Sequence, residues 1–211
     1  MTAPHSERPL RIGVLVSRGG RTAVNLAERI ARGEVPAEIA LAVLHDPEVP
    51  AFERLRRVGV PVEVVASPPH RELSPEQADS IADRIDAAFE SAGVELVCLC
   101  GYLRRFRVGE RWARRAINIH PSLLPEFGGE GFHGLHVHRA VLAAGRAETG
   151  CTVHWVDEEY DRGETILQRR CPVLAGDTPE SLAARVFAEE CEAMPEAVAR
   201  LAKRRLPASK S

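Results

Sequence analysis

Several features that define other classes of protein are missing from this chain of 211 residues. No apolar run reaches the length of a transmembrane helix, and the opening residues, MTAPHSERPL, lack the apolar segment of a signal peptide. The formal net charge is only −2, so the composition indicates no surface for extended nucleic-acid binding. We therefore expect a cytoplasmic protein without a membrane or nucleic-acid partner.

The cysteines and histidines also lack the spacings of known scaffolds. The five cysteines are odd in number and do not follow a disulfide pattern, which predicts reduced thiols. Cys98 and Cys100 share a strand face, but no second pair accompanies them, so we assign them to the core. His133, His136 and His138 lack a cysteine or carboxylate that would complete a zinc site. We expect no metal, and we expect His133 and His136 to cap and line the start of a helix.

The chain reads as one domain in which strands and helices alternate. Four apolar runs are typical of buried strands: 11–16, 39–44, 62–65 and 94–99. Three stretches between them have helical patterns: 23–30, 50–58 and 76–92. Two later runs alternate like antiparallel strands and precede a long helix: 150–156 and 165–173, then 179–205. This order predicts an α/β fold with a mostly parallel twisted sheet, helices on both faces and an antiparallel C-terminal portion.

The stretch AINIHPSLLP, residues 116–125, predicts a strand that ends at a functional edge. Side chains alternate along a strand, so Ile117 and Ile119 face a core while Asn118 and His120 share the opposite face. Pro121 cannot continue a central strand, which places His120 at the carboxyl end, where open α/β sheets bind ligands. A structural histidine and a turn asparagine are the alternative.

A glycine turn, SRGGRT at residues 17–22, connects the first predicted strand to the first predicted helix. Free backbone N–H groups at a helix start form a ready anion site. The segment is neither a P-loop nor G-x-G-x-x-G, so no ATP or dinucleotide fingerprint is present. The alternative is a tight turn that needs glycine for a positive φ.

Two further predicted loops contain residues that suggest ligand contacts. After the strand at 94–99, Leu103 and Phe106 are apolar where a loop is normally polar, which indicates either packing on the core or a wall for a flat ligand. The neighbouring arginines, Arg104, Arg105 and Arg107, form a solvated face or meet an acidic ligand tail. The turn DEEYDRG at 157–163 is dense in carboxylates, and Asp161 would lie beside Asn118 and His120 if the flanking strands join the sheet.

Four motifs together resemble the folate-dependent formyltransferases: NIHPSLLP at 118–125, TGCTVH at 149–154, DRG at 161–163 and ILQ at 166–168. The similarity covers about residues 10–203 and is greatest to the branch that acts on 5′-phosphoribosylglycinamide. The resemblance implies a Rossmann-like fold, 10-formyltetrahydrofolate as co-substrate and a role in purine synthesis. It also implies one domain at 10–205, with 10–100 binding the ribonucleotide phosphate and 101–205 binding folate and performing catalysis. The residues at the two ends, 1–9 and 206–211, are expected to be flexible tails.

The resemblance assigns roles by position. It implies a catalytic trio of Asn118, His120 and Asp161. It implies these ribonucleotide-binding residues: Gly19, Gly20, Arg21, Thr22 and Glu190. It implies these folate-binding residues: Leu103, Arg104, Arg105, Phe106, Asn118, Val156, Asp157 and Asp161.

Some positions depart from the family pattern. Arg21-Thr22 replaces a frequent Ser-Asn, Gly128–Gly134 is longer than a common Pro-Gly turn, and Cys191 replaces a frequent histidine. A family arginine has only Arg71 as a candidate counterpart. These departures concern substrate contacts rather than the chemistry.

The chemistry of formyl transfer is consistent with the trio. An asparagine amide suits a developing oxyanion, and a histidine can donate to the same oxygen or move the amine proton. We expect the Asp161 carboxylate to raise the pKa of His120. A sugar-nucleotide formyltransferase, a 10-formyltetrahydrofolate hydrolase and a non-catalytic binding protein are the alternatives. Extra domains typical of hydrolases and of methionyl-tRNA formyltransferases are not expected. We expect small-molecule substrates and a monomer or homodimer.

Overall fold

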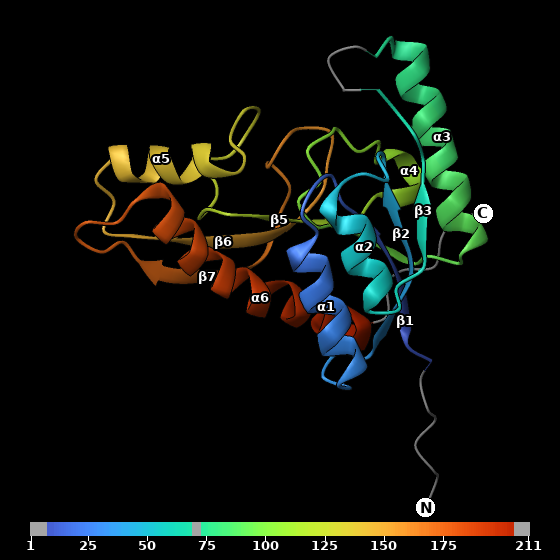
Figure 1. Cartoon of the computed structure of the whole chain (residues 1–211), viewed down its shortest axis with the longest axis horizontal. Coiled ribbons are helices and arrows are strands. Elements are labelled where there is room, and N and C mark those ends of the chain that lie inside the picture. Colours follow the sequence, from blue (N-terminus) through green and yellow to red (C-terminus); the bar gives the residue numbers. More distant parts are fainter. Residues whose placement is uncertain (1–7, 69–72, 205–211) are drawn as a thin grey trace, which may run out of the picture.

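The computed structural model describes residues 8–68 and 73–204, and within them one seven-stranded sheet has the order β3-β2-β1-β4-β5-β6-β7 (Figure 1). The strands are β1 (Leu10–Leu15), β2 (Ala37–Leu44), β3 (Val62–Val64), β4 (Leu96–Leu99), β5 (Ala116–His120), β6 (Glu148–Trp155) and β7 (Thr165–Pro172). The helices are α1 (Arg21–Ala31), α2 (Pro50–Arg57), α3 (Pro75–Ser91), α4 (Gly109–Trp112), α5 (Leu135–Ala143) and α6 (Pro179–Arg204).

The strand pairing confirms the predicted fold class. Strands β1 to β5 pair in parallel, whereas β6 pairs antiparallel with both β5 and β7. The chain runs outward from β1 to β3 and then returns to β4 on the other side of β1. The carboxyl ends of β1 and β4 therefore border the crevice where the strand order reverses, which is the usual ligand site of such sheets.

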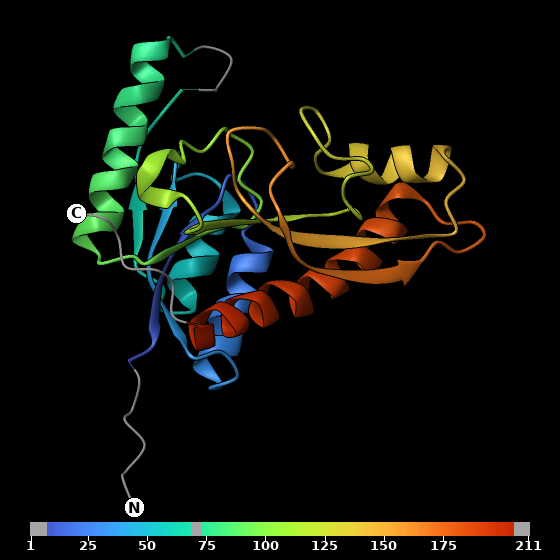
Figure 2. The same cartoon turned by 180° about the vertical axis from the view of Figure 1, so that it is seen from behind.

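Helices cover both faces of the sheet, and strand alternation supplies each layer with its apolar side chains (Figures 1 and 2). Ile12 and Val14 of β1 are fully buried in one core together with residues of α1, α2 and α6. Leu15 faces the opposite core, where α3 packs. Gly13 also faces α3, and a Cβ there would lie 2.6 Å from a ring carbon of Phe89, so the strand and helix approach too closely for any side chain.

Two details differ from the sequence-based expectations. Helix α1 begins at Arg21, so Arg21 and Thr22 belong to its first turn rather than to the preceding loop. Helix α4 is not predicted by the sequence, because four residues are too few to display a helical period. Cys98 and Cys100 lie buried in one core cluster, as predicted, and the five cysteines are free.

Within residues 8–68 and 73–204, none of the helices has the length and apolar character that a membrane crossing requires. The tails expected at 1–9 and 206–211 lie almost entirely outside the described residues, as does Arg71.

Candidate active site

Strand β5 presents Asn118 and His120 as its alternation predicts. Ile117 and Ile119 are buried in the core on the α1 and α6 side of the sheet. Asn118 and His120 project from the opposite side, and His120 is only 4% exposed. The strand ends at His120, so both polar side chains lie at the carboxyl edge of the sheet.

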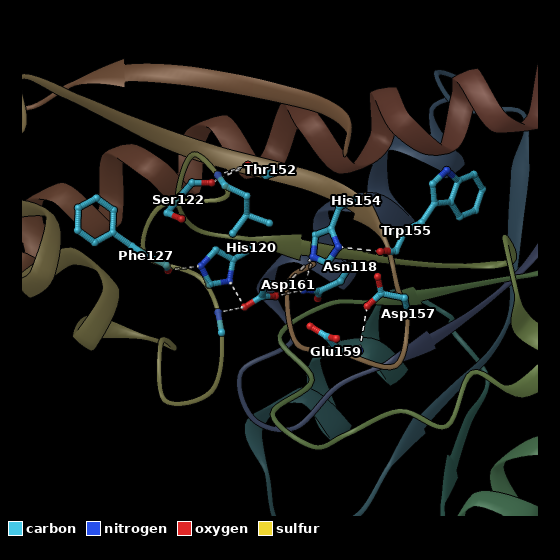
Figure 3. A network of polar contacts seen from close by, with 12 residues as sticks. Asn118, His120, Ser122, Phe127, Thr152, His154, Trp155, Asp157, Glu159 and Asp161 are labelled. Carbon is cyan, nitrogen blue, oxygen red and sulfur yellow. Dashed lines mark hydrogen bonds and ion pairs between the residues drawn. The ribbon is translucent and has the colours of Figure 1, made fainter. Parts of the chain in front are cut away.

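Asp161 joins these two residues from the loop between β6 and β7 (Figure 3). Its Oδ2 lies 3.3 Å from Nδ1 of His120, and its Oδ1 accepts a hydrogen bond of 3.4 Å from Nδ2 of Asn118. Asp161 has a left-handed backbone with a φ of +56°, which is uncommon for a residue with a side chain. Gly163 allows the loop to close on β6, because a Cβ there would lie 1.8 Å from the Trp155 carbonyl oxygen.

His154 completes the cluster, although its sequence pattern indicated no role for it. Its Nδ1 lies 2.8 Å from the carbonyl oxygen of Trp155, which requires a proton on Nδ1. Its Nε2 therefore accepts from Nδ2 of Asn118 at 3.1 Å, and it lies 3.5 Å from Oδ1 of Asp161. The signal that reveals His154 is strand register, since Asn118 pairs with His154 across β5 and β6.

The electrostatics of the cluster correct one expectation. Burial lowers the pKa of His120 more than Asp161 and the Phe127 carbonyl raise it, and His154 lowers it further. Asp161 does raise the pKa of His120, as predicted, but removal of an imidazolium from water outweighs one neighbouring carboxylate, so the net shift is downward. For Asp161, burial alone would raise the pKa, but His154, His120 and the Gly129 N–H together lower it. At neutral pH the pair is a neutral imidazole beside a carboxylate.

The segment after β5 also contacts the cluster. Nε2 of His120 lies 2.7 Å from the carbonyl oxygen of Phe127, and the N–H of Gly129 donates to Oδ2 of Asp161 at 2.9 Å. Contrary to the prediction, His133 and His136 do not cap α5. Gly134 occupies the N-cap position, and no side-chain hydrogen bond caps the helix.

His138 on α5 is a second buried histidine to which the sequence motifs gave no role. It is 4% exposed and lines the same cavity as the cluster. Its Nδ1 has no hydrogen-bond partner among the described residues. Burial, and to a smaller extent the charge of His120, lower the pKa of His138 to about 4. Among the residues that the structure describes, no three potential ligands gather as a metal site.

One cavity of about 720 Å³ collects the candidate residues at the carboxyl edge of the sheet. Its walls come from the segments after β1, β4, β5 and β6 and from α6. All of the predicted site residues line it: Gly19, Gly20, Arg21, Thr22, Leu103, Arg104, Arg105, Phe106, Asn118, His120, Val156, Asp157, Asp161 and Glu190.

One end of the cavity is built around the start of α1. Gly20 precedes the helix with a φ of +65°, which confirms the need for glycine in this turn. Thr22 donates a hydrogen bond of 3.3 Å to Oε2 of Glu190 on α6. The guanidinium of Arg21 lies 4.0 Å from the ring centre of Phe187. Burial raises the pKa of Glu190 to about 7, although Thr22 and Arg21 oppose that rise.

The other end contains the loop after β4. Leu103 is 39% exposed and faces the cavity, whereas Phe106 is 6% exposed and packs against Trp112, so Phe106 mainly supports the wall. Phe132 and Tyr160 are exposed aromatic residues that also line the cavity, and the sequence motifs did not identify them.

The three arginines of this loop have different surroundings. Arg104 donates to Ser67, and Arg105 donates to the carbonyl of Glu158, which also lines the cavity. Arg107 binds Asp83 and Asp86 on α3 and does not line the cavity. Of the three, only Arg104 and Arg105 lie where a ligand tail can reach them.

The fold is an α/β sheet whose cavity joins a glycine turn at a helix start to a buried Asn–His–Asp cluster. The formyl transferase family model matches residues 10–198. The chain belongs to this family and is a formyltransferase, as the motifs implied.

Relatives of known structure or name are similar over most of the chain. A phosphoribosylglycinamide formyltransferase of Arabidopsis thaliana is 36% identical over 96% of this chain and 68% of that protein. A trifunctional purine biosynthetic protein of Drosophila pseudoobscura is 38% identical over 91% of this chain but only 14% of its own length. The crystal structure of glycinamide ribonucleotide transformylase 1 from Symbiobacterium toebii is 36% identical, covers 95% of this chain and 91% of that one, and has a TM-score of 0.82.

Proposed function

We propose that this enzyme transfers the formyl group of 10-formyltetrahydrofolate to the amine of 5′-phosphoribosylglycinamide in purine biosynthesis. The products are the N-formyl ribonucleotide and tetrahydrofolate. The observation that carries the proposal is the single cavity in which the Gly20 turn and Glu190 face the same space as Asn118, His120 and Asp161. The names of two similar proteins support the same acceptor, and the name of a third supports purine biosynthesis.

The ribonucleotide occupies the end of the cavity at α1. The first backbone N–H groups of α1, which follow Gly20, lack carbonyl partners within the helix and therefore suit a phosphate. Arg21 adds a positive charge at this turn and is oriented by the Phe187 ring, 4.0 Å away. Glu190 is hydrogen-bonded by Thr22 and supplies carboxylate oxygens for donors of the ribonucleotide.

The folate occupies the other end. Leu103 to Phe106 form one wall for the pterin, and Val156, Asp157 and Asp161 hold its polar edge. Arg104 and Arg105 lie at the mouth, where the acidic tail of a folate leaves the cavity. The formyl carbon then lies between the two substrates, beside Asn118.

The reaction requires a place for negative charge and a route for one proton. The amine nitrogen attacks the formyl carbon, and the carbonyl oxygen becomes the oxyanion of a tetrahedral intermediate. The N–H of Asn118 that donates to His154 turns to that oxyanion, and one such donor is worth about 3 kcal/mol. Asp161 with His120 removes the amine proton and returns a proton to the folate nitrogen as the carbon–nitrogen bond breaks. His120 also stabilises the oxyanion when it is protonated.

The wider organisation of the protein follows from these assignments. Residues 10–205 act as one domain, with the phosphate end in 10–100 and the folate end and catalytic residues in 101–205. The enzyme requires no metal and works as a monomer or homodimer. Its free thiols support a reducing, cytoplasmic setting.

A spectrophotometric assay with a 10-formyl folate analogue, run with and without the ribonucleotide, tests the proposal. We expect folate product only when the ribonucleotide is present, loss of product in His120→Ala, and retained product in His136→Ala, a histidine that does not line the cavity. Equal rates without any acceptor would identify a hydrolase. Bound folate without product would favour a sugar nucleotide as acceptor or a non-catalytic binding protein.

A further inference from the structure

We propose that the turn Phe127–Gly129 is a positioning element for His120 and Asp161. Its carbonyl determines which ring nitrogen of His120 carries the proton, and its N–H holds the carboxylate of Asp161. The inference rests on the proposed function for the catalytic roles of these two side chains.

The Phe127 carbonyl determines the tautomer of His120. A carbonyl oxygen only accepts hydrogen bonds, so the Nε2 atom 2.7 Å away must carry a hydrogen. In the neutral ring, Nδ1 is then the unprotonated nitrogen. Nδ1 lies 3.3 Å from Oδ2 of Asp161. The proton that His120 gains and loses therefore lies on the side of Asp161.

The Gly129 N–H holds the same carboxylate oxygen. It donates to Oδ2 of Asp161 at 2.9 Å, while Oδ1 is held by Asn118 at 3.4 Å. Because the Gly129 donor does not titrate, Oδ2 keeps a hydrogen bond whether or not Nδ1 of His120 is protonated. The carboxylate thus stays in place through a cycle of proton transfer.

The backbone on both sides of these contacts is strained. Phe127 and Asp161 have φ values of +55° and +56°, although neither is a glycine. Such conformations persist when surrounding contacts hold them, and they concentrate at functional sites. Here each strained residue contributes one group to the same small cluster.

Side chains of β6 and β7 anchor the turn. Thr152 is fully buried; its Oγ1 donates to the Ser122 carbonyl at 2.7 Å and accepts from the Leu124 N–H at 3.0 Å. Gln168 donates to the Leu124 carbonyl at 2.9 Å. Ser122 donates through its hydroxyl to the Glu126 carbonyl at 2.7 Å. These bonds connect the central sheet to the residue directly before Phe127.

Gly128 allows the turn to approach Asp161. A Cβ on Gly128 would lie 2.4 Å from Cδ2 of Leu124 and 3.1 Å from Cβ of Asp161. The Leu124 side chain can rotate away, but the Asp161 contact involves an atom next to the backbone. An alanine at position 128 therefore pushes the turn and the carboxylate apart.

The test compares Gly128→Ala with Gly33→Ala. Gly33 has a φ of +74°, lies outside the cavity, and has no neighbouring atom within 4 Å of the position that a Cβ would take. We expect kcat of Gly128→Ala to fall roughly 10- to 100-fold, with the KM of each substrate within about 3-fold. Loss of the Gly129 donor should raise the pKa of Asp161, so the acidic limb of the kcat–pH profile should move to higher pH. The other titratable groups that face the cluster, His120, His154 and His138, are unchanged in the variant. A kcat within about 2-fold of Gly33→Ala, or parallel losses in kcat and KM, would overturn the proposal.

Two further measurements do not depend on the folding of Gly128→Ala. Phe127→Gly relieves the strain but keeps both backbone groups, so we expect kcat within about 3-fold of the unmodified enzyme; a loss of about 10-fold would assign the effect to the phenyl ring instead. Histidine ¹⁵N NMR of the intact enzyme should show the neutral His120 ring protonated at Nε2, and protonation at Nδ1 would overturn the inference. If formyl transfer itself is absent, the proposed function fails while the NMR result still tests the turn.

Discussion

His120 Nδ1 lies 3.3 Å from Oδ2 of Asp161, although one residue ends β5 and the other belongs to the loop between β6 and β7. Both side chains are largely removed from water, with exposed fractions of 5% and 10%. Water screens their interaction little, so Asp161 raises the pKa of His120 and His120 lowers the pKa of Asp161, in addition to the effect of burial on each. This burial distinguishes the pair from a surface ion pair and supports the catalytic role proposed for it.

Replacement of Asp161 by asparagine should separate turnover from binding. The variant keeps the size of the side chain but loses the charge that the proton transfer requires, so we expect kcat to fall by about 10²- to 10⁴-fold. Ribonucleotide affinity, measured by calorimetry, should change less than about 3-fold, because Asp161 does not contact the phosphate end. Comparable losses in turnover and affinity would contradict the assignment.

Removal of the Asn118 amide should destabilise the oxyanion of the tetrahedral intermediate and so lower turnover. We expect Asn118→Ala to lower kcat by about 10²- to 10³-fold, since one neutral donor to the intermediate is lost. Steady-state kinetics give the change, and a thermal melt shows whether the variant is folded. Turnover within a few-fold of the unmodified enzyme in a folded variant would mean that another group binds the oxyanion.

The pKa of Glu190 should appear in the pH dependence of ribonucleotide binding. Burial raises that pKa to about 7, so the carboxylate form becomes dominant as the pH rises through neutrality. Because the carboxylate accepts hydrogen bonds better than the acid, we expect KM for the ribonucleotide to fall by up to about 10-fold between pH 6 and pH 8. Glu190→Gln should show a flatter profile over this range, and an unchanged slope in that variant would exclude Glu190 as the titrating group.

Buried histidines should make the fold sensitive to acid. Burial lowers the pKa of His45 to about 4, although its bond to the Val65 carbonyl opposes this, whereas an unfolded histidine titrates near 6.5. The unfolded state therefore binds more protons between these values, so stability is lost as the pH falls from 6.5 toward 4. His45 lowers the free energy of unfolding by at most about 1.4 kcal/mol for each pH unit in this range.

His45→Gln tests this dependence, because glutamine retains hydrogen-bonding groups for the Val65 carbonyl and the Tyr102 hydroxyl without a titration. Urea unfolding at pH 4.5 and pH 7 should show a smaller difference in the variant than in the unmodified protein. Glu190 has the opposite effect on stability, so Glu190→Gln serves as a comparison. The raised pKa of Glu190 stabilises the folded state at low pH, and this contribution is lost as the pH rises from 4.5 to 7. Equal pH dependence in all three proteins would contradict both assignments.

Local patterns predicted much of the fold and the main site residues. The alternation of Ile117 and Ile119 with Asn118 and His120 is a property of five consecutive residues, and the structure reproduces it. The glycine turn before α1 and the antiparallel strands near the C-terminal end are equally local signals. The roles assigned to these residues remain predictions until they are tested.

Other features depend on contacts between distant segments. His154 contacts Asn118 because of the register between β5 and β6, which no single segment displays. Phe106 has the apolar side chain expected of a ligand wall, but it packs against Trp112 of α4, a helix that the sequence did not predict. The interpretation of His133 and His136 as caps was wrong because Gly134 takes the N-cap position.

The sequence by itself determined the order of elements, the face on which each strand residue lies and the identity of the groups available for chemistry. Those properties follow from side-chain periodicity and backbone preference over a few residues. Only the tertiary structure decided the direction of the His120 pKa shift, the placement of Glu190 beside Thr22 and the two bonds from the Phe127–Gly129 turn. Desolvation and hydrogen-bond geometry depend on everything packed around a group, so they exist only once the chain has folded.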